Sequence, residues 1–175
     1  MRGHPRILPK YLSRQSGRVC LLVVSAIAVA MLVVSLTSSS ARLVWNFTPS
    51  IPTGLYSIED RAWRRDDRVA LKPSGHVQEL LRTLGVLKEG RLLMKRVAAG
   101  EGDEVCRTGL QVTLNGEATV HAQQGQQLPF WSGCRVLKAG EVFLLGETDN
   151  SFDGRYFGIT SATDIVGPLR SILTF

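Results

Sequence analysis

A serine in a stiff turn and a lysine in an apolar segment are the residues of this sequence best suited to chemistry. Ser50 is bracketed by Pro49 and Pro52, so its hydroxyl sits on a backbone poorly suited to regular structure. Lys95 lies in residues 92–97, Leu-Leu-Met-Lys-Arg-Val. A lysine removed from water loses its proton more easily and can then act as the base for a serine nucleophile without any histidine. The two residues together predict a Ser–Lys hydrolase.

Each feature also has a purely structural interpretation. Residues 50–56 could be a plain turn that leads into a strand. Lys95 could face solvent at the edge of a sheet, although lysine is rarely placed among apolar residues unless it is paired or tuned. Because alternate residues of a strand face opposite sides, Lys95 and Arg96 point in opposite directions, and one of the two cations is expected to face inward.

A third segment, residues 146–158, is dense in Asp, Asn, Ser and Gly and lies between two apolar stretches. This composition is typical of a loop. A calcium-binding loop is another interpretation, but the alternating acidic residues and the terminal glutamate of such a loop are missing. No metal site is therefore predicted.

The elements that must position these residues follow an uncharged apolar run, residues 19–36. Its eighteen residues would reach about 27 Å as a helix, which is enough to cross the hydrocarbon core of a membrane. Five cations and no acidic residue precede it, and the first charge after it is Arg42. Cationic flanks stay in the cytoplasm. The pattern predicts a cytoplasmic basic tail at 1–18, a transmembrane anchor at 19–36, a linker at 37–45 and an exported domain at 46–175.

A cleaved signal peptide is the competing interpretation of residues 1–41. Ser39 and Ala41 would suit a cleavage site of small residues, but the apolar run is longer than the usual apolar region of a signal peptide. The sequence favours a retained anchor.

The charge outside the basic tail is nearly balanced. The formal net charge is +6, but without the five N-terminal cations 16 Lys and Arg stand against 15 Asp and Glu. This balance gives no support for a nucleic-acid surface.

Two of the three cysteines, Cys106 and Cys134, fall in the predicted exported domain. Oxidising conditions there favour a disulfide, with two free thiols as the alternative. The pair does not resemble a zinc site, which needs more ligands at closer spacing.

The remaining sequence predicts an all-β domain, with short strands between turn residues. A hairpin turn is expected at Asn115-Gly116. One amphipathic helix is expected around residues 77–87, with Ser74 as its N-cap. The strand candidates are residues 68–71, 92–97, 110–114, 142–145 and 165–173.

Three ordered motifs resemble the serine signal peptidase family (type I signal peptidases and their relatives). Ser-Ile-Pro at 50–52 is similar to the family's Ser-Met-Pro motif. Lys-Arg-Val at 95–97, with Gly-Asp at 102–103, is similar to its Lys-Arg-Val…Gly-Asp motif. Residues 150–158, Asn-Ser-Phe-Asp-Gly-Arg-Tyr-Phe-Gly, are similar to its Asn-Ser-x-Asp-Ser-Arg-Tyr-x-Gly motif. The resemblance spans roughly residues 45–170.

Within the family, the sequence is most similar to the conjugative-transfer peptidases of the TraF type. The shared features are the single anchor, the compact body and the form Ser-x-Pro-x-Gly-Leu-Tyr at 50–56. Residues 131–135, Trp-Ser-Gly-Cys-Arg, with a partner at Cys106, also resemble that branch. The sequence departs from the family pattern at Gly154, where serine is usual, at residues 99–101 before Gly-Asp, and in a shortened stretch at 146–148.

The resemblance implies a role for each matching residue. Ser50 would be the nucleophile that forms an acyl-enzyme, and Lys95 the neutral base that takes its proton. Ser151 would hold the lysine amine toward Ser50. The oxyanion hole would consist of the Ser50 N–H and the Thr48 hydroxyl. Asp153 and Arg155 would form a supporting ion pair that shapes the loop.

The resemblance also implies a fold, a location and a substrate class. The expected fold is a signal-peptidase-like β-barrel. The protein is expected to cross the bacterial inner membrane once, to have its catalytic domain in the periplasm and to need no cofactor. The expected partners are the lipid bilayer and a membrane-bound precursor, in particular a pilin subunit of a conjugative transfer apparatus. The acyl group held by the enzyme could then be transferred to water or to the peptide's own amine. Two alternatives remain: a housekeeping signal peptidase, and a non-enzymatic, membrane-tethered assembly factor of the secretion channel.

Overall fold

The computed structural model describes residues 11–37, 42–86, 90–123 and 128–175 and divides the chain into two units, Met1–Ser40 and Ala41–Phe175. The first unit contains helix α1 (Tyr11–Thr37). Within the described residues, no helix combines the length and the apolarity needed to cross a membrane. The transmembrane anchor predicted at residues 19–36 is therefore not supported. Most of the predicted basic tail lies outside the described residues.

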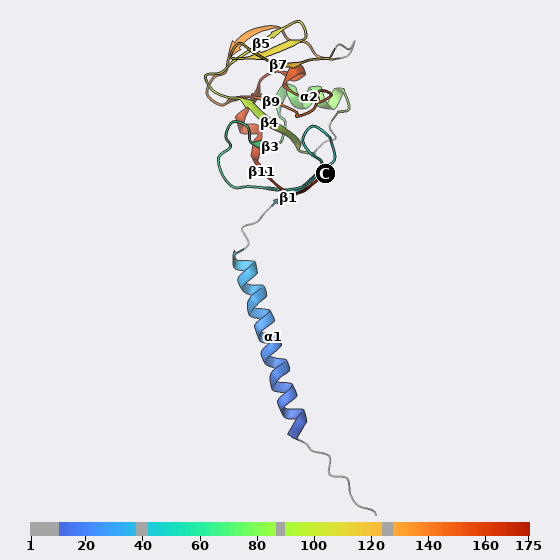
Figure 1. Cartoon of the computed structure of the whole chain (residues 1–175), viewed down its shortest axis with the longest axis vertical. Helices are drawn as coiled ribbons and strands as arrows, with labels where there is room; N and C mark the ends of the chain where they lie inside the picture. The colour runs from blue at the N-terminus through green and yellow to red at the C-terminus, as the bar shows by residue number, and fades with distance from the viewer. Residues whose placement is uncertain (1–10, 38–41, 87–89, 124–127) are drawn as a thin grey trace, which may run out of the picture. The chain divides into compact units, whose positions relative to one another are not determined.

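The second unit is built mainly of antiparallel strands (Figure 1). Its seven-stranded sheet has the order β1-β2-β11-β3-β4-β9-β10, and its four-stranded sheet has the order β7-β6-β5-β8. The strands of the large sheet are β1 (Arg42–Asn46), β2 (Gly54–Ile58), β3 (Arg68–Leu71), β4 (Leu93–Ala99), β9 (Glu141–Leu145), β10 (Thr160–Ser161) and β11 (Ile165–Thr174). The strands of the small sheet are β5 (Glu104–Thr108), β6 (Gln111–Leu114), β7 (Glu117–His121) and β8 (Gly133–Val136).

The mostly-β architecture is confirmed, but the expected barrel is not closed by hydrogen bonds. In the described residues β1 and β10 are the outer strands of the large sheet and do not pair with each other. With only two residues, β10 is too short to continue the sheet. The strand β1 also occupies part of the predicted linker, because residues 42–46 pair along their whole length with β2.

All five predicted strands exist with bounds within two residues of those expected. The hairpin turn is confirmed as well: Asn115 and Gly116, with φ of 51° and 81°, join β6 to β7. These left-handed angles are those that a two-residue type I′ turn requires.

The predicted helix is α2 (Gly75–Thr83), and Ser74 is its N-cap residue. The Ser74 side chain does not cap the helix, because its hydroxyl donates to Asp164. Two short helical turns complete the domain: α3 (Gly154–Phe157) and η1 (Ala162–Asp164).

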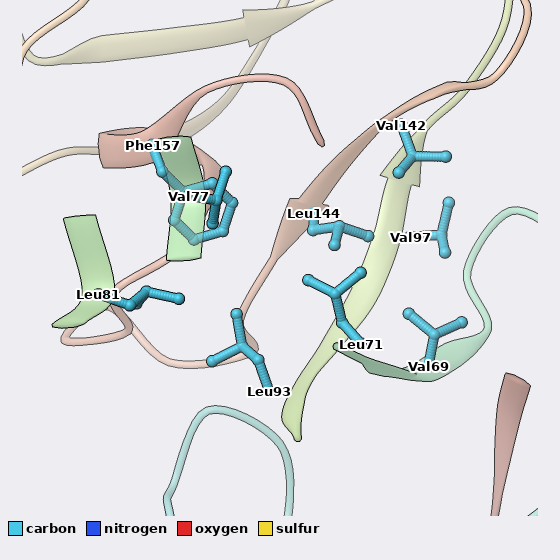
Figure 2. Close-up of a cluster of buried hydrophobic side chains, with 9 residues drawn as sticks. All are labelled: Val69, Leu71, Val77, Leu81, Leu93, Val97, Val142, Leu144 and Phe157. Carbon is cyan, nitrogen blue, oxygen red and sulfur yellow. The ribbon is translucent and has the colours of Figure 1, made fainter. Parts of the chain in front are cut away.

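The main core lies between α2 and the strands β3, β4 and β9 (Figure 2). On α2, Val77 and Leu81 are buried against this core, four residues apart and so on one face of the helix. On β4, Leu93 and Val97 face the same core. Since residues two apart on a strand share a face, Lys95 must leave β4 on the apolar side.

Candidate active site

The Lys95 side chain is buried by the elements that flank β4. Only 2% of the residue is exposed. Its register partner on β3 is Val69, and Leu93 and Val97, two positions away on β4, are buried in the core. Its amine Nζ donates a hydrogen bond to Ser151 Oγ at 2.8 Å. Burial lowers the pKa of Lys95 from 10.5 to about 8, against an opposing effect of the Asp153 carboxylate and with a further lowering by Arg155. The amine is thus neutral in a sizeable fraction of molecules near neutral pH.

The adjacent Arg96 faces the other way, as the alternation of β4 predicts. It is partly exposed and pairs with Asp66 at 2.5 Å. The inward cation of the pair is therefore Lys95, and the solvent-facing interpretation of this lysine is wrong.

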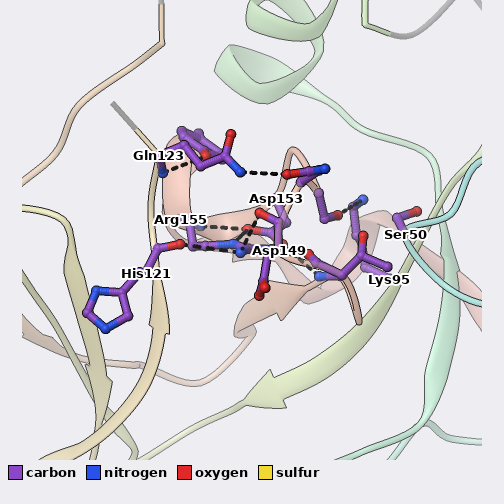
Figure 3. A network of polar contacts seen from close by, with 12 residues as sticks. Ser50, Lys95, His121, Gln123, Asp149, Asp153 and Arg155 are labelled. Carbon is purple, nitrogen blue, oxygen red and sulfur yellow. Dashed lines mark hydrogen bonds and ion pairs between the residues drawn. The ribbon is translucent and has the colours of Figure 1, made fainter. Parts of the chain in front are cut away.

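The serine lies in the turn between β1 and β2, and its side chain is buried (Figure 3). Ser50 Oγ is 3.2 Å from both the Met94 carbonyl and Thr48 Oγ1. The Ser50 carbonyl accepts from the Glu147 N–H at 2.6 Å, which ties the turn to the loop after β9. Among the described residues the Ser50 N–H has no hydrogen-bond partner, so it is free to donate to a ligand.

No hydrogen bond joins Ser50 Oγ to Lys95 Nζ in the described part of the chain. The two groups nevertheless line one cleft of about 650 Å³, together with Thr48 and Ser151. Rotation about the Ser50 Cα–Cβ bond would move the hydroxyl away from the Met94 carbonyl. Catalytic hydrogen bonds are often long or absent in a free enzyme and form only when substrate binds.

Ser151 reaches Lys95 because the loop after β9 packs closely upon itself. A Cβ atom at Gly146 would lie 1.9 Å from Ser151 Oγ and 3.2 Å from the Ser50 carbonyl. Only a residue without a side chain fits between these two serines. Since β9 pairs with β4, the start of this loop lies next to Lys95.

An ion pair fixes the far end of the same loop. Asp153 and Arg155 are both buried, 0% and 1% exposed, and their closest charged atoms are 2.7 Å apart. Asp153 also accepts from the Gly146 N–H at 2.7 Å. Arg155 donates to the carbonyls of Thr148 and Asp149, at 2.8 and 3.0 Å. Both ends of the loop that carries Ser151 are thereby held.

Residues of the small sheet form further hydrogen bonds with Arg155 of this ion pair. Arg107 of β5 is buried and donates to the Arg155 carbonyl, and Arg155 donates to the His121 carbonyl of β7 at 3.4 Å. The neighbouring Cys106 forms a disulfide with Cys134 of β8. This sheet therefore supports the loop at a distance and contributes no group to the cleft.

The departure from the family pattern at position 154 has a steric cause. A Cβ atom at Gly154 would meet the Leu144 carbonyl oxygen at 2.7 Å and the ring of Phe143 at 2.8 Å. The α3 turn packs directly on β9, so a serine does not fit here unless the backbone moves.

Two positions that shape the site, Gly146 and Asn46, were not predicted as site residues from the sequence. Asn46 ends β1, is 4% exposed, and bonds across the whole turn that carries Ser50. A signal existed, because an asparagine just before a turn commonly bonds the backbone two residues on. Nothing local marks Gly146, whose close contact is with residues that only the folded loop brings near.

The cleft offers no group of ligands for a metal. The one cluster of possible metal ligands among the described residues consists of Glu104 with Cys106 and Cys134, and these two cysteines are joined in the disulfide.

Comparison with known proteins identifies the family of this chain. A protein-family model described as signal peptidase, peptidase S26, matches residues 16–174. Two plasmid transfer proteins TraF from Escherichia coli are similar: one is 31% identical over 153 residues, which cover 74% of this chain and 82% of the relative, and the other is 30% identical over 169 residues, which cover 88% and 94%. A probable conjugal transfer protein TraF of Sinorhizobium fredii is 30% identical over 145 residues, 74% of this chain and 76% of the relative.

Among solved structures, the crystal structure of a signal peptidase I from Enterococcus faecalis aligns with a TM-score of 0.40 and 18% identity, covering 64% of this chain and all of that one. The family model covers most of the sequence, including the three motifs, and two relatives match at 30% identity or more over most of both chains. The chain belongs to the signal peptidase family, peptidase S26.

Proposed function

We propose that residues 42–175 form a serine endopeptidase in which Ser50 is the nucleophile and Lys95 the general base. The observation that carries the proposal is the buried Lys95 amine, held by Ser151 in the cleft that Ser50 also lines. A purely structural lysine would be exposed or paired with a carboxylate. Here the hydrogen-bond partner of the amine is a hydroxyl, which leaves a neutral amine able to accept a proton.

The reaction begins when the Ser50 hydroxyl turns from the Met94 carbonyl toward Lys95. Ser50 Oγ attacks the scissile carbonyl carbon while its proton passes to the Lys95 amine. The carbonyl oxygen becomes an oxyanion, to which the unpaired Ser50 N–H and the Thr48 hydroxyl donate. Collapse of this intermediate breaks the C–N bond, and the leaving amine takes the proton from Lys95. The products of this half-reaction are the acyl-enzyme and the released peptide.

In the second half-reaction the neutral Lys95 takes a proton from an incoming nucleophile, which attacks the ester carbonyl. The bond between the carbonyl carbon and Ser50 Oγ then breaks, and Lys95 returns the proton to Ser50 Oγ. Water as nucleophile gives hydrolysis. A free amine of the same peptide gives a cyclic product instead, with the same proton transfers. Both outcomes use the same groups of the cleft, so the product itself must be measured.

For the substrate, we propose an exported precursor protein. The relatives are named as plasmid and conjugal transfer proteins, which supports a precursor that belongs to a conjugative transfer system, and we propose a pilin subunit as that precursor. The disulfide between Cys106 and Cys134 supports a domain that works in an oxidising compartment, which in bacteria is the periplasm. The proposed partner is therefore a precursor presented on the exported side of the inner membrane.

The test uses purified full-length protein and a pilin precursor of a conjugative transfer system, with products identified by mass spectrometry. Ser50→Ala and Lys95→Ala should each abolish processing while the circular dichroism spectrum stays unchanged. Lys95→Arg should also fail, because a guanidinium does not give up its proton at workable pH. The matched control is Lys138→Ala, which alters an exposed lysine outside the cleft and should process normally.

Processing by folded Ser50→Ala or Lys95→Ala protein would refute the dyad and favour the assembly-factor alternative. Equal cleavage of unrelated exported precursors would favour a housekeeping signal peptidase. A product lighter than the linear fragment by one water would identify cyclisation.

A further inference from the structure

The side chain of Asn46 is buried beneath the turn that carries Ser50. Its amide nitrogen donates to the carbonyls of Thr48, Ile51 and Pro52, at 2.8, 2.9 and 3.1 Å. Carbonyl oxygens only accept, so these three bonds identify this amide atom as the nitrogen. The amide oxygen Oδ1 therefore points the other way, toward Thr48.

Asn46 Oδ1 accepts two hydrogen bonds from Thr48, one from its N–H at 3.2 Å and one from its hydroxyl at 3.1 Å. An amide oxygen has no proton to give, so the single hydroxyl proton of Thr48 is directed to Asn46. The lone pairs of Thr48 Oγ1 then face Ser50 Oγ, 3.2 Å away. The three side chains form one chain of contacts, in which Thr48 donates to Asn46 and the single hydroxyl proton of Ser50 has two acceptors in reach, the Met94 carbonyl and Thr48 Oγ1.

From this geometry, and resting on the peptidase function proposed above, we infer that Asn46 is a positioning residue of the reaction. It fixes the backbone and the side-chain rotamer of Thr48, so that the Thr48 hydroxyl stays next to the nucleophile. When the oxyanion forms, the Thr48 proton turns from Asn46 Oδ1 to the oxyanion. Asn46 keeps the bond from the Thr48 N–H, so its buried oxygen is not left without a partner.

An asparagine suits this position because it offers two donors and one acceptor on a short planar group. Aspartate would keep the acceptor but would set a negative charge against three carbonyl oxygens. Alanine would remove both functions and leave the Thr48 hydroxyl free to rotate. The inference thus separates two roles of Asn46: donors that close the turn, and an acceptor that orients Thr48.

A double-mutant cycle tests the inference in the full-length protein. Asn46→Ala, Thr48→Val and the combined variant are compared by kcat and KM for precursor processing and by their midpoints of urea unfolding. Thr48→Val should lower kcat about 100-fold, which is typical for the loss of one oxyanion donor. Asn46→Ala should lower kcat between about 10- and 100-fold with little change in KM, and the combined variant should be within about threefold of Thr48→Val, because residues that act as one unit are not additive.

Two further variants complete the experiment. In a Thr48→Ser background, which restores the hydroxyl, Asn46→Ala should again lower kcat. Asn115→Gly is the matched control: Asn115 also uses both ends of its amide, toward Asp103 and the Glu104 N–H, but in the β6–β7 turn, and its loss should leave kcat unchanged. Where Asn46→Ala does not fold, Asn46→Ser replaces it, since serine can also accept from the N–H two residues on.

The result that overturns the inference is a multiplicative loss of kcat in the combined variant, because Asn46 would then act independently of Thr48. An unchanged kcat for Asn46→Ala would overturn it as well. Neither result touches the proposed function, which fails instead if the wild-type protein does not process the precursor or if Ser50→Ala does.

Discussion

Replacing Lys95 by methionine should make the protein more stable near neutral pH while it abolishes processing. Lys95 is 2% exposed, and its pKa is lowered from 10.5 to about 8, chiefly because burial disfavours the charged amine. The two values differ by about 2.5 pH units, which corresponds to about 3 kcal/mol of unfolding free energy. Methionine fills nearly the same volume and has no charge to bury.

The direction of the pH dependence follows from proton binding. Between about pH 8 and 10.5 the unfolded state binds more protons at this position than the folded state does. The stability of the wild-type protein therefore falls as the pH is lowered through this window and loses nothing further from Lys95 below it. The methionine variant has no such dependence at this position.

The expected net gain is smaller than the full effect of the charge. Lys95→Met also removes the hydrogen bond to Ser151, which costs about 1 kcal/mol. At pH 7 the variant should be more stable than the wild-type protein by about 2 kcal/mol, and near pH 10.5 it should be less stable by about 1 kcal/mol.

The assay is urea unfolding at both pH values, followed by the fluorescence of Trp45, Trp63 and Trp131, which all lie in the domain. Lys138→Met, at an exposed lysine, is the control and should show the same difference from wild type at both pH values. A Lys95→Met variant destabilised equally at pH 7 and pH 10.5 would refute the reasoning, because the wild-type amine would then not be desolvated.

The same pKa sets the pH dependence of processing. With a pKa of about 8, roughly 10% of Lys95 is neutral at pH 7, against about 0.03% for an ordinary lysine. The rate should therefore rise about tenfold per pH unit below pH 8 and level off above it. A rate that keeps rising to pH 10 would contradict a lowered pKa.

The remaining predictions concern the support of the site. Ser151→Ala should slow processing less than Lys95→Ala does, since the hydroxyl only orients the amine. Gly146→Ala should slow it more than Ser151→Ala, because its Cβ would lie 1.9 Å from Ser151 Oγ and displace the loop. Replacing both Cys106 and Cys134 by serine should lower the unfolding free energy by about 3–4 kcal/mol, as expected for a bridge across 28 positions. Asp153→Ala should cost about 3–5 kcal/mol, because it leaves a buried arginine without its partner.

Kinetics and urea unfolding measure these effects, and each has a contrary outcome. Gly146→Ala protein with the rate of wild type would show that the loop relaxes without losing Ser151. The variant without Cys106 and Cys134 should be as stable as the reduced wild-type protein. Stability equal to that of the oxidised wild-type protein would contradict the prediction. For Asp153, the control is Glu79→Ala, which breaks an exposed pair and should change stability by less than about 1 kcal/mol.

Local sequence pattern predicted five of the eleven strands in the described part of the chain and the hairpin turn, and it indicated Ser50 and Lys95 as candidate reactive residues. Strand alternation predicted that Lys95 and Arg96 face opposite sides, and Asn115-Gly116 marked a turn, because both are local properties of the backbone. The order of the three motifs was enough to indicate the family. Local pattern did not predict β1, whose short segment is a strand because it pairs with β2.

Which side chains meet in the site depends on how segments far apart in the sequence pack together. Lys95 is buried because β9 and its loop cover it, and that loop fits because Gly146 has no side chain between Ser50 and Ser151. The bonds of Asn46 across the turn depend equally on the folded path of the chain. The pKa of Lys95 depends on the groups packed around its amine, and the one farthest away in the sequence, Arg155, is separated from Lys95 by 60 positions. The spacing of these residues along the sequence does not show that they are in contact. Their effect on the pKa of Lys95 can therefore be judged only from the folded structure.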